Sequence, residues 1–245
     1  MKIIDAHWEL RNLGLSTQEV EIESEDTLEE VKQALSSLTA NYQVVKVPVA
    51  DLNLSSLLSS YGFSFAEAMI RVSHSLKELS CSSLIKRISD QITFEEMSND
   101  ETEIMHQQIK NGMFQTDRVI LDPIFSPSQA ANRYILWMKD EKERGSVLYT
   151  YKYKGQPVGF SCMREINPQV YYPVLGGIYS QGKALPFGSA IIYKQLEIAK
   201  RLGGKQLVTY ISTNNPGVIR AYSQLGYVFE DIKYVFVKHF SIKDV

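Results

Sequence analysis

The chain has 245 residues, of which 44% are hydrophobic and 11% aromatic, a globular composition that excludes collagen-like and wholly disordered chains. Its two cysteines are too few for a disulfide framework or a cysteine-rich zinc site. The formal net charge of −2 provides no field for holding nucleic acid, and the length suits one large domain or two small ones.

The first part of the chain predicts a small α/β module over residues 1–80. Residues 19–23 alternate between polar and apolar side chains, which is typical of a half-buried strand. Apolar residues at helical spacing over 28–38 predict a helix, and Asp51 is placed to cap another. The expected elements are strands over 19–23, 42–49 and 66–72 and helices over 28–38 and 51–58.

A second unit is expected over residues 81–245, joined to the first by residues 73–90, which are rich in serine and lysine. Glycines end its helices, and Lys154-Gly155 is the predicted turn of a β-hairpin. No internal repeat is visible in the sequence. The expected elements are helices over 93–110, from 128 onward, over 187–202 and over 215–225, and strands over 146–153, 156–164, 170–179, 207–211 and 227–240.

A loop of small residues, 181–189, leads from the strand over 170–179 into the long helix. Unpaired backbone N–H groups at a helix start lie at the positive end of the helix dipole, so they can bind a pyrophosphate. Lys183 adds a positive charge. The loop matches neither GxGxxG nor GxxxxGK[ST], so a Rossmann site and a P-loop are unsupported. A plain strand-to-helix turn is the alternative.

A second motif follows the next expected strand. Asn215 and Tyr222 have the spacing N-x6-Y, and Leu225-Gly226-Tyr227 ends the segment. Taken with the loop 181–189, this motif resembles the GCN5-related N-acetyltransferase superfamily.

The resemblance extends to dTDP-fucosamine acetyltransferases and related sugar-nucleotide amine acetyltransferases, over residues 19–65, the segment 62–67, the helix with Tyr134 and Trp137, and the whole C-terminal half. The resemblance implies an α/β fold: a mixed, mostly antiparallel sheet flanked by helices over 81–245, which binds acetyl-CoA, with the smaller α/β module over 1–80. It implies acetyl-CoA as co-substrate and no metal. The residues then expected to bind the cofactor are Gly177, Ile178, Tyr179, Gln181, Gly182, Lys183, Ala184, Phe187, Gly188, Ser189 and Asn215.

Some of these positions depart from the family pattern or have a second explanation. Leu185-Pro186 lengthens the phosphate loop before Phe187, and proline has no N–H to offer a phosphate. Gly176-Gly177 weakens a strand, which is expected where a ligand or a bulge approaches, and the resemblance implies that a backbone N–H here polarises the thioester carbonyl. Asn215 either caps its helix or hydrogen-bonds the pantetheine arm.

The resemblance also implies catalytic and acceptor-binding residues. Tyr222 is the expected general acid for the departing thiolate, the alternative being a tyrosine that faces the core. Glu67 is the candidate base, through water, against the alternative of a solvent-facing strand glutamate. Arg118, Asp122 and Tyr134 lie in the segment that borders the acceptor in relatives. Asp122 can instead shape a turn, and Tyr134 can belong to the core.

The expected function is therefore transfer of an acetyl group from acetyl-CoA to the primary amine of a small acceptor, a nucleotide-linked amino sugar. Residues 1–80 carry 12 acids and 6 bases, a net charge of −6, whereas residues 81–245 carry 20 bases and 16 acids, a net charge of +4. Because the module over 1–80 is acidic, a polyamine is an alternative acceptor. The sequence equally allows an amino acid or an antibiotic as the acceptor, or a non-catalytic module that binds acyl-CoA or a protein.

The sequence contains no run of about 20 apolar residues that could span a bilayer, and acidic residues interrupt the start where a signal peptide needs an apolar run. We expect a cytoplasmic protein without nucleic-acid or membrane partners. A homodimer is expected only from the family resemblance.

Overall fold

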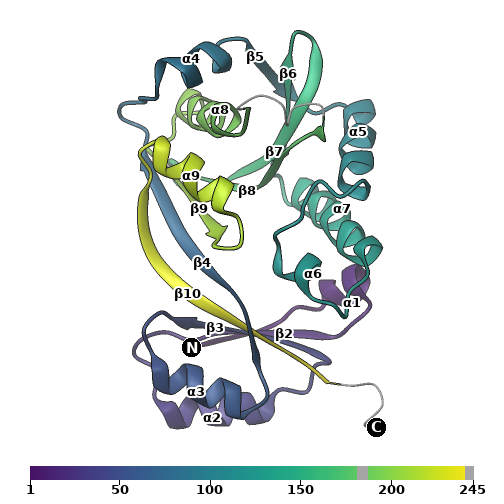
Figure 1. Ribbon diagram of the computed structural model, residues 1–245, viewed down its shortest axis with the longest axis vertical. Coiled ribbons are helices and arrows are strands. Elements are labelled where there is room, and N and C mark those ends of the chain that lie inside the picture. Colours follow the sequence, from purple (N-terminus) through teal and green to yellow (C-terminus); the bar gives the residue numbers. More distant parts are fainter. Residues whose placement is uncertain (181–186, 241–245) are drawn as a thin grey trace.

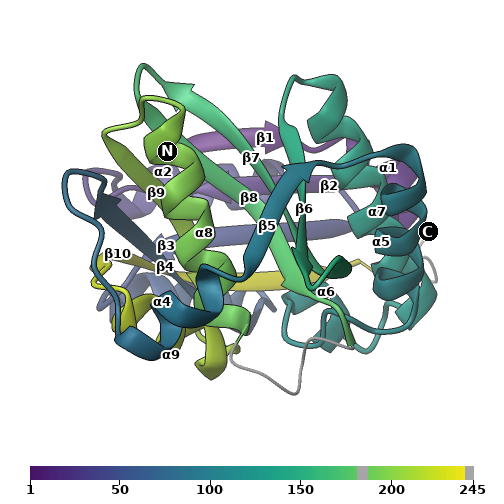
Figure 2. The ribbon, with the colours of Figure 1, turned by 90° about the horizontal axis from the view of Figure 1, so that it is seen from above.

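The computed structural model of the chain describes residues 1–180 and 187–240. Within these residues ten strands form one sheet, and helices cover both of its faces (Figures 1 and 2). The strands are β1 (Lys2–Asp5), β2 (Thr17–Glu21), β3 (Tyr42–Pro48), β4 (Ser64–Ser75), β5 (Ile92–Glu96), β6 (Val147–Tyr153), β7 (Gln156–Asn167), β8 (Val170–Ile178), β9 (Gln206–Ser212) and β10 (Val228–His239). The helices are α1 (Trp8–Leu13), α2 (Leu28–Ser37), α3 (Leu52–Ser60), α4 (Ser83–Ser89), α5 (Asn99–Lys110), α6 (Arg118–Leu121), α7 (Pro127–Glu143), α8 (Phe187–Arg201) and α9 (Pro216–Gln224).

The sheet has the order β1-β2-β3-β10-β4-β9-β8-β7-β6-β5. Two neighbouring pairs, β2 with β3 and β8 with β9, are parallel, and the other pairs are antiparallel. The expected mixed, mostly antiparallel sheet flanked by helices is thereby confirmed.

Apolar residues on the helices bury each face of the sheet. Val31 and Leu35 of α2 pack with Val45 of β3 in the N-terminal part, as the helical spacing in the sequence predicts. In the C-terminal part α8 lies to one side of β6–β8, and α5 with α7 lies to the other (Figure 2). Strand alternation explains this arrangement, because the consecutive residues Leu148 and Tyr149 of β6 face the α5 and α7 side and the α8 side, respectively.

Two long strands connect the N-terminal and C-terminal parts of the sheet. β10 pairs with β3 on one edge and with β4 on the other, and β4 pairs with β9. Figure 1 shows β4 and β10 running side by side between the upper and lower parts of the molecule. The sheet is therefore continuous from residues 1–80 into the rest of the chain, and the domain boundary near residue 80 stays a prediction.

The chain contains a repeated topology without a repeated sequence. The series β2-α2-β3-α3-β4 and β8-α8-β9-α9-β10 each consist of a parallel strand pair, joined by a helix, and a third strand after a second helix. The sheet order 2-3-10-4-9-8 reads the same when the two series are exchanged and the order is reversed. The third strand of each series therefore pairs with the second strand of the other series, and this pairing joins the two halves of the sheet.

Several expected boundaries differ from those of the structure. The expected helix over 93–110 begins only at Asn99: Ile92–Glu96 pairs with β6 as a strand, and Ser98 with Glu101 forms the capping box. The expected joint over 73–90 contains the end of β4 and the helix α4. The helix expected from residue 128 starts at Pro127, because Ser126 is its N-cap. In the described part of the chain, no helix meets the length and hydropathy that crossing a membrane requires.

Candidate functional site

The parallel strands β8 and β9 separate soon after they meet. They pair only through Val170 with Gln206 and Tyr171 with Leu207, although both strands continue well beyond this point. A cavity of about 340 Å³ lies where they have separated. This volume is within the usual range for small-molecule sites.

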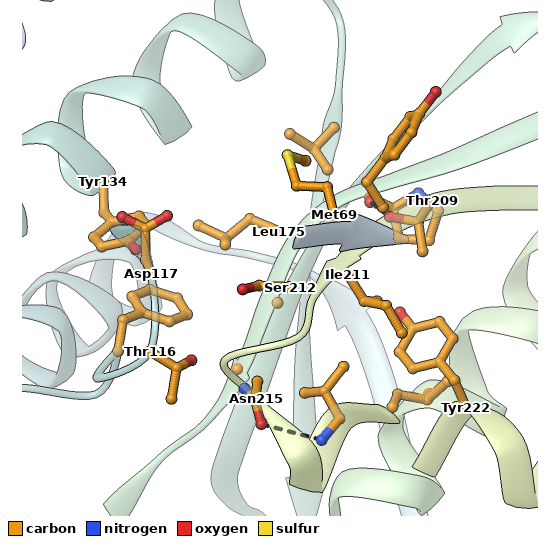
Figure 3. A pocket seen from close by; sticks show the side chains of 18 of the residues that line it. Met69, Thr116, Asp117, Tyr134, Leu175, Thr209, Ile211, Ser212, Asn215 and Tyr222 are labelled. Carbon is orange, nitrogen blue, oxygen red and sulfur yellow. Dashed lines mark hydrogen bonds between the residues drawn. The ribbon is translucent and has the colours of Figure 1, made fainter. Parts of the chain in front are cut away.

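Two walls of side chains enclose this cavity (Figure 3). Thr116, Asp117 and Tyr134 lie on one side, whereas Asn215 and Tyr222 of the α9 segment lie on the other. Between them are side chains of the central strands, namely Met69 of β4, Leu175 of β8 and Ile211 and Ser212 of β9.

The separated edge of β8 directs backbone amides into the cavity. Tyr179 N–H donates to the Val158 carbonyl at 2.9 Å, which places this residue in a hydrogen-bonded pair with β7. Residues of an antiparallel strand alternate between facing their partner and facing away. The register of β7 and β8 therefore directs the N–H groups of Gly176 and Ile178 away from β7, toward the side on which β9 has diverged.

Glycines occupy the closest approaches around this edge. A Cβ at Gly159 would lie 2.5 Å from the carbonyl oxygen of Gly177, and a Cβ at Gly176 would lie 3.0 Å from that of Phe160. A Cβ at Gly177 would meet the Met113 side chain at 3.0 Å. The glycines thus let β7 and the segment after α5 pack tightly against the strand that borders the cavity.

Tyr222 is both buried and part of the cavity wall. Its side chain is 7% exposed, and its ring lies 4.6 Å from that of Tyr227. Burial raises the pKa of Tyr222, so the phenol keeps its proton at neutral pH. The two explanations for this tyrosine, a core residue and a site residue, therefore coexist.

Asn215 likewise caps its helix and lines the cavity. Its Oδ1 accepts a hydrogen bond from the Val218 N–H at 3.1 Å, which caps α9. Because the cap uses only the carbonyl oxygen, the side-chain NH₂ is still available as a donor at the cavity wall.

The expected cofactor residues have different environments. Gly177, Ile178 and Gly188 line the cavity. Tyr179 and Phe187 are buried outside the cavity lining, the Tyr179 ring 6.3 Å from Phe160 and the Phe187 ring 5.1 Å from Tyr153. Ser189 donates to the Gln224 side chain at 3.4 Å. Four expected phosphate-loop residues lie outside the described residues: Gln181, Gly182, Lys183 and Ala184.

A buried charge cluster closes the other end of the cavity. Arg118 on α6 contacts Glu67 of β4 at 3.5 Å and Glu19 of β2 at 3.4 Å. Burial alone would raise the pKa of Glu19, but attraction by Lys46, 2.9 Å away, and by Arg118 lowers it to about 2. Glu67 is only 3% exposed, so it is not the solvent-facing glutamate of the alternative explanation.

The other two residues expected near the acceptor lie in different pockets. Tyr134 lines the cavity and its ring is 4.4 Å from that of Phe114; burial and the nearby Asp117 raise the pKa of Tyr134. Asp122 instead lines a second pocket, where its carboxylate lies 2.7 Å from His239 Nε2. It also accepts from the Ile124 N–H at 3.1 Å, the turn-shaping contact considered from the sequence.

Sequence reasoning missed several polar residues of the cavity. Asp117 caps α6, and Arg133 forms a bidentate pair with Glu9 at 2.8–3.1 Å. Gln195 of α8 is 4% exposed, and its Oε1 has no hydrogen-bond partner within the described ranges. Gln195 could have been noticed in the sequence, because it is a polar residue on the apolar side of the helix over 187–202. No sequence pattern points to Arg133.

Comparison with known proteins supports the fold and not a specific activity. No family model matches the chain, and no curated protein matches its sequence. Among solved structures, a functionally unknown conserved protein from Staphylococcus epidermidis has 12% identity and a TM-score of 0.66, with 92% of this chain and 85% of that chain covered.

Two further solved structures carry the family name. A GCN5-related N-acetyltransferase from Sphaerobacter thermophilus has 10% identity and a TM-score of 0.62, covering 97% of this chain and 75% of that chain. A GCN5-related N-acetyltransferase from Kribbella flavida has 14% identity and a TM-score of 0.56, covering 94% of this chain and 84% of that chain. The chain therefore has the GCN5-related N-acetyltransferase fold. Its particular likeness to sugar-nucleotide amine acetyltransferases stays a prediction.

The edge of β8 fits a thioester cofactor. On the side away from β7 it offers amide donors for carbonyl groups. No group of three or more histidine, cysteine or carboxylate residues is arranged to hold a metal within residues 1–180 and 187–240.

Proposed function

We propose that this chain is an acetyl-CoA-dependent N-acetyltransferase that acts on the primary amine of a small acceptor. The observation that carries the proposal is the separation of β8 from β9, with two outward amides on one strand and a buried phenol across the cavity. The fold shared with GCN5-related N-acetyltransferases agrees with it.

Acetyl-CoA would supply an acetyl group activated as a thioester. The amides of Gly176 and Ile178 are placed to hydrogen-bond a carbonyl oxygen in the cavity, and a donor of this kind can lower a barrier by about 3–4 kcal/mol. Alignment of the two reactants between the walls contributes roughly 7–11 kcal/mol in favourable cases.

Two buried residues would transfer the protons, Glu67 on β4 and Tyr222 on α9. As the C–N bond forms and the C–S bond breaks, the amine proton passes through water to Glu67 and the Tyr222 proton passes to the sulfur. The proton that Glu67 receives balances the one that Tyr222 gives up. Because burial makes ionisation of Tyr222 costly, its proton moves only as negative charge develops on the sulfur.

The charges of the cavity bear on the acceptor. Its lining contains two carboxylates, Glu67 and Asp117, and two guanidinium groups, Arg118 and Arg133. This balance does not favour a polycationic acceptor. The sequence resemblance to sugar-nucleotide amine acetyltransferases leads us to propose a nucleotide-linked amino sugar as the acceptor.

The test is to incubate the protein with acetyl-CoA and a panel of amines and to measure release of free thiol. The panel should contain nucleotide-linked amino sugars, free amino sugars, amino acids and polyamines. We expect acceptor-dependent thiol release that is greatest with a nucleotide-linked amino sugar. Binding of coenzyme A without thiol release from any amine would instead identify a non-catalytic acyl-CoA-binding module.

A further inference from the structure

A second pocket adjoins the acceptor end of the cavity. It has a volume of about 350 Å³ and lies between the start of β4, the segment after α6 and the end of β10. Arg118 lines both this pocket and the first cavity. The two spaces therefore share Arg118 as a wall residue.

Large apolar side chains surround this second pocket and remain exposed. Phe65, Leu121 and Ile124 are 56%, 54% and 55% exposed, respectively. Phe65 is held edge-on by Tyr234 and Phe236, with ring centroids 5.7 Å away in both cases. A fixed aromatic ring that is exposed at a concave site favours binding of a flat or apolar group.

One positively charged side chain of this pocket, Lys238, faces aromatic rings instead of a carboxylate. Asp122 is paired with His239 at 2.7 Å. The Lys238 ammonium lies over the rings of Phe63 and Phe240, at 5.6 Å and 4.4 Å from their centroids. In the described part of the chain it has no carboxylate partner. An anionic group would supply the missing countercharge.

Arg118 adds donor capacity where the two spaces meet. Its contacts with Glu19 and Glu67, at 3.4 and 3.5 Å, are longer than good hydrogen bonds. Its two terminal amino groups contact one carboxylate each and carry four N–H donors between them, so Arg118 can bind a further oxygen while it keeps both carboxylates.

We propose that this second pocket binds the non-reacting part of the acceptor, a flat ring that carries an anionic group such as a nucleoside diphosphate. The inference rests on the proposed function, because it places the reacting amine near Glu67. Residue 64, in the second pocket, is three residues from Glu67 along β4, a span of about 10 Å. An acceptor that reaches both spaces must therefore extend beyond a single small amine.

Isothermal titration of the whole chain with thymidine diphosphate and uridine diphosphate tests this directly, with and without saturating coenzyme A. Thymidine and inorganic pyrophosphate are the probes for the ring alone and the anion alone. We expect the diphosphates to bind in the presence of coenzyme A and more tightly than either fragment. Lys238→Gln should weaken their binding about tenfold, since hydrogen bonds to charged groups contribute that much.

Matched variants locate the binding site. Lys154→Gln removes the same charge from the distant β6–β7 turn and should leave the affinity unchanged. Phe65→Leu should weaken the binding of the nucleoside diphosphates but leave the binding of pyrophosphate unchanged. Equal effects of Lys238→Gln and Lys154→Gln, no diphosphate binding, or competition with coenzyme A would each overturn the inference. Because binding is measured without turnover, these results are separate from those of the thiol-release assay.

Discussion

Tyr222 is the residue on which the proposed proton transfer most depends. It lies in the cavity wall on α9, and burial keeps its phenol protonated. Tyr222→Phe removes only the hydroxyl, so the packing of the ring against Tyr227 should persist. We expect kcat to fall roughly 10²–10⁴-fold, the usual range for a general acid or base. The affinity for coenzyme A, measured by titration, should be nearly unchanged.

Tyr153→Phe is the control for this substitution, since Tyr153 lies on β6 outside the cavity lining. It should keep wild-type turnover. A Tyr222→Phe protein with wild-type kcat would remove Tyr222 from the proposed mechanism.

The site residues that the sequence could predict are those of local motifs. Asn215 and Tyr222, which line the cavity, could be singled out because their spacing spans one short helix and its N-cap, and Gly176-Gly177 because glycines are unusual inside a strand. Arg133 could not be found in this way, because its role depends on Glu9, 124 residues away in the sequence. Contacts of this kind arise from tertiary packing, which no local pattern encodes.

At the scale of elements, α8 provides the test of the proposed phosphate site. Gly188 lies in its first turn and lines the cavity, and a Cβ there would contact only the end of the Ile178 side chain, at 3.3 Å. Gly188→Asp should fold, because a carboxylate near a helix N-terminus is favourable. It should abolish the rise in melting temperature that coenzyme A gives the wild type, since it repels a phosphate.

Gly188→Asn has a similar shape without the charge and should keep most of that rise in melting temperature. Equal shifts for the wild type, Gly188→Asp and Gly188→Asn would place the phosphates of coenzyme A elsewhere.

Helix predictions succeeded where apolar residues recur at helical spacing. The expected helix over 28–38 is present as α2 with Val31 and Leu35 buried, although its N-cap is Thr27 and not a residue of 24–26. The prediction was wrong at β5, because Thr93 and Glu96 imitate a capping box, whereas pairing with β6 makes this segment a strand. Strand pairing is non-local, so tertiary structure overrides the local preference.

At the scale of the whole molecule, the exchange of β4 and β10 could not be predicted from the sequence. The two series of elements share a topology, but the sequence shows no repeat, and strand order depends on pairing between distant segments. This exchange brings Glu67 of β4 near the separated strands of the C-terminal half. The candidate site is therefore built from both parts of the chain.

The buried cluster around Arg118 links these parts and should make stability depend on pH. The pKa of Glu19 is about 2 in the folded chain, against 4.5 for the unperturbed group. The ionised Glu19 side chain therefore contributes to the free energy of unfolding above about pH 4.5, and this contribution is lost as the pH falls toward 2. Between pH 6 and pH 3 the free energy of unfolding should fall by about 2 kcal/mol through this group.

Urea unfolding across this pH range measures the effect. Glu19→Gln should be less stable than the wild type at pH 6 and should lose about 2 kcal/mol less on acidification. Glu25→Gln, at an exposed position, is the control for loss of a carboxylate. Parallel pH profiles for the wild type and Glu19→Gln would show that this ion cluster does not control acid stability.

Amide hydrogen exchange at Gly176 and Ile178, followed by NMR with and without acetyl-CoA, tests the central claim most directly. If the open edge of β8 holds the cofactor, these two amides should exchange markedly more slowly when acetyl-CoA is present. The amide of Tyr179, which already donates to β7, should change little. Unchanged exchange at both positions under saturating acetyl-CoA would contradict the assignment of this cavity as the acetyl-CoA site.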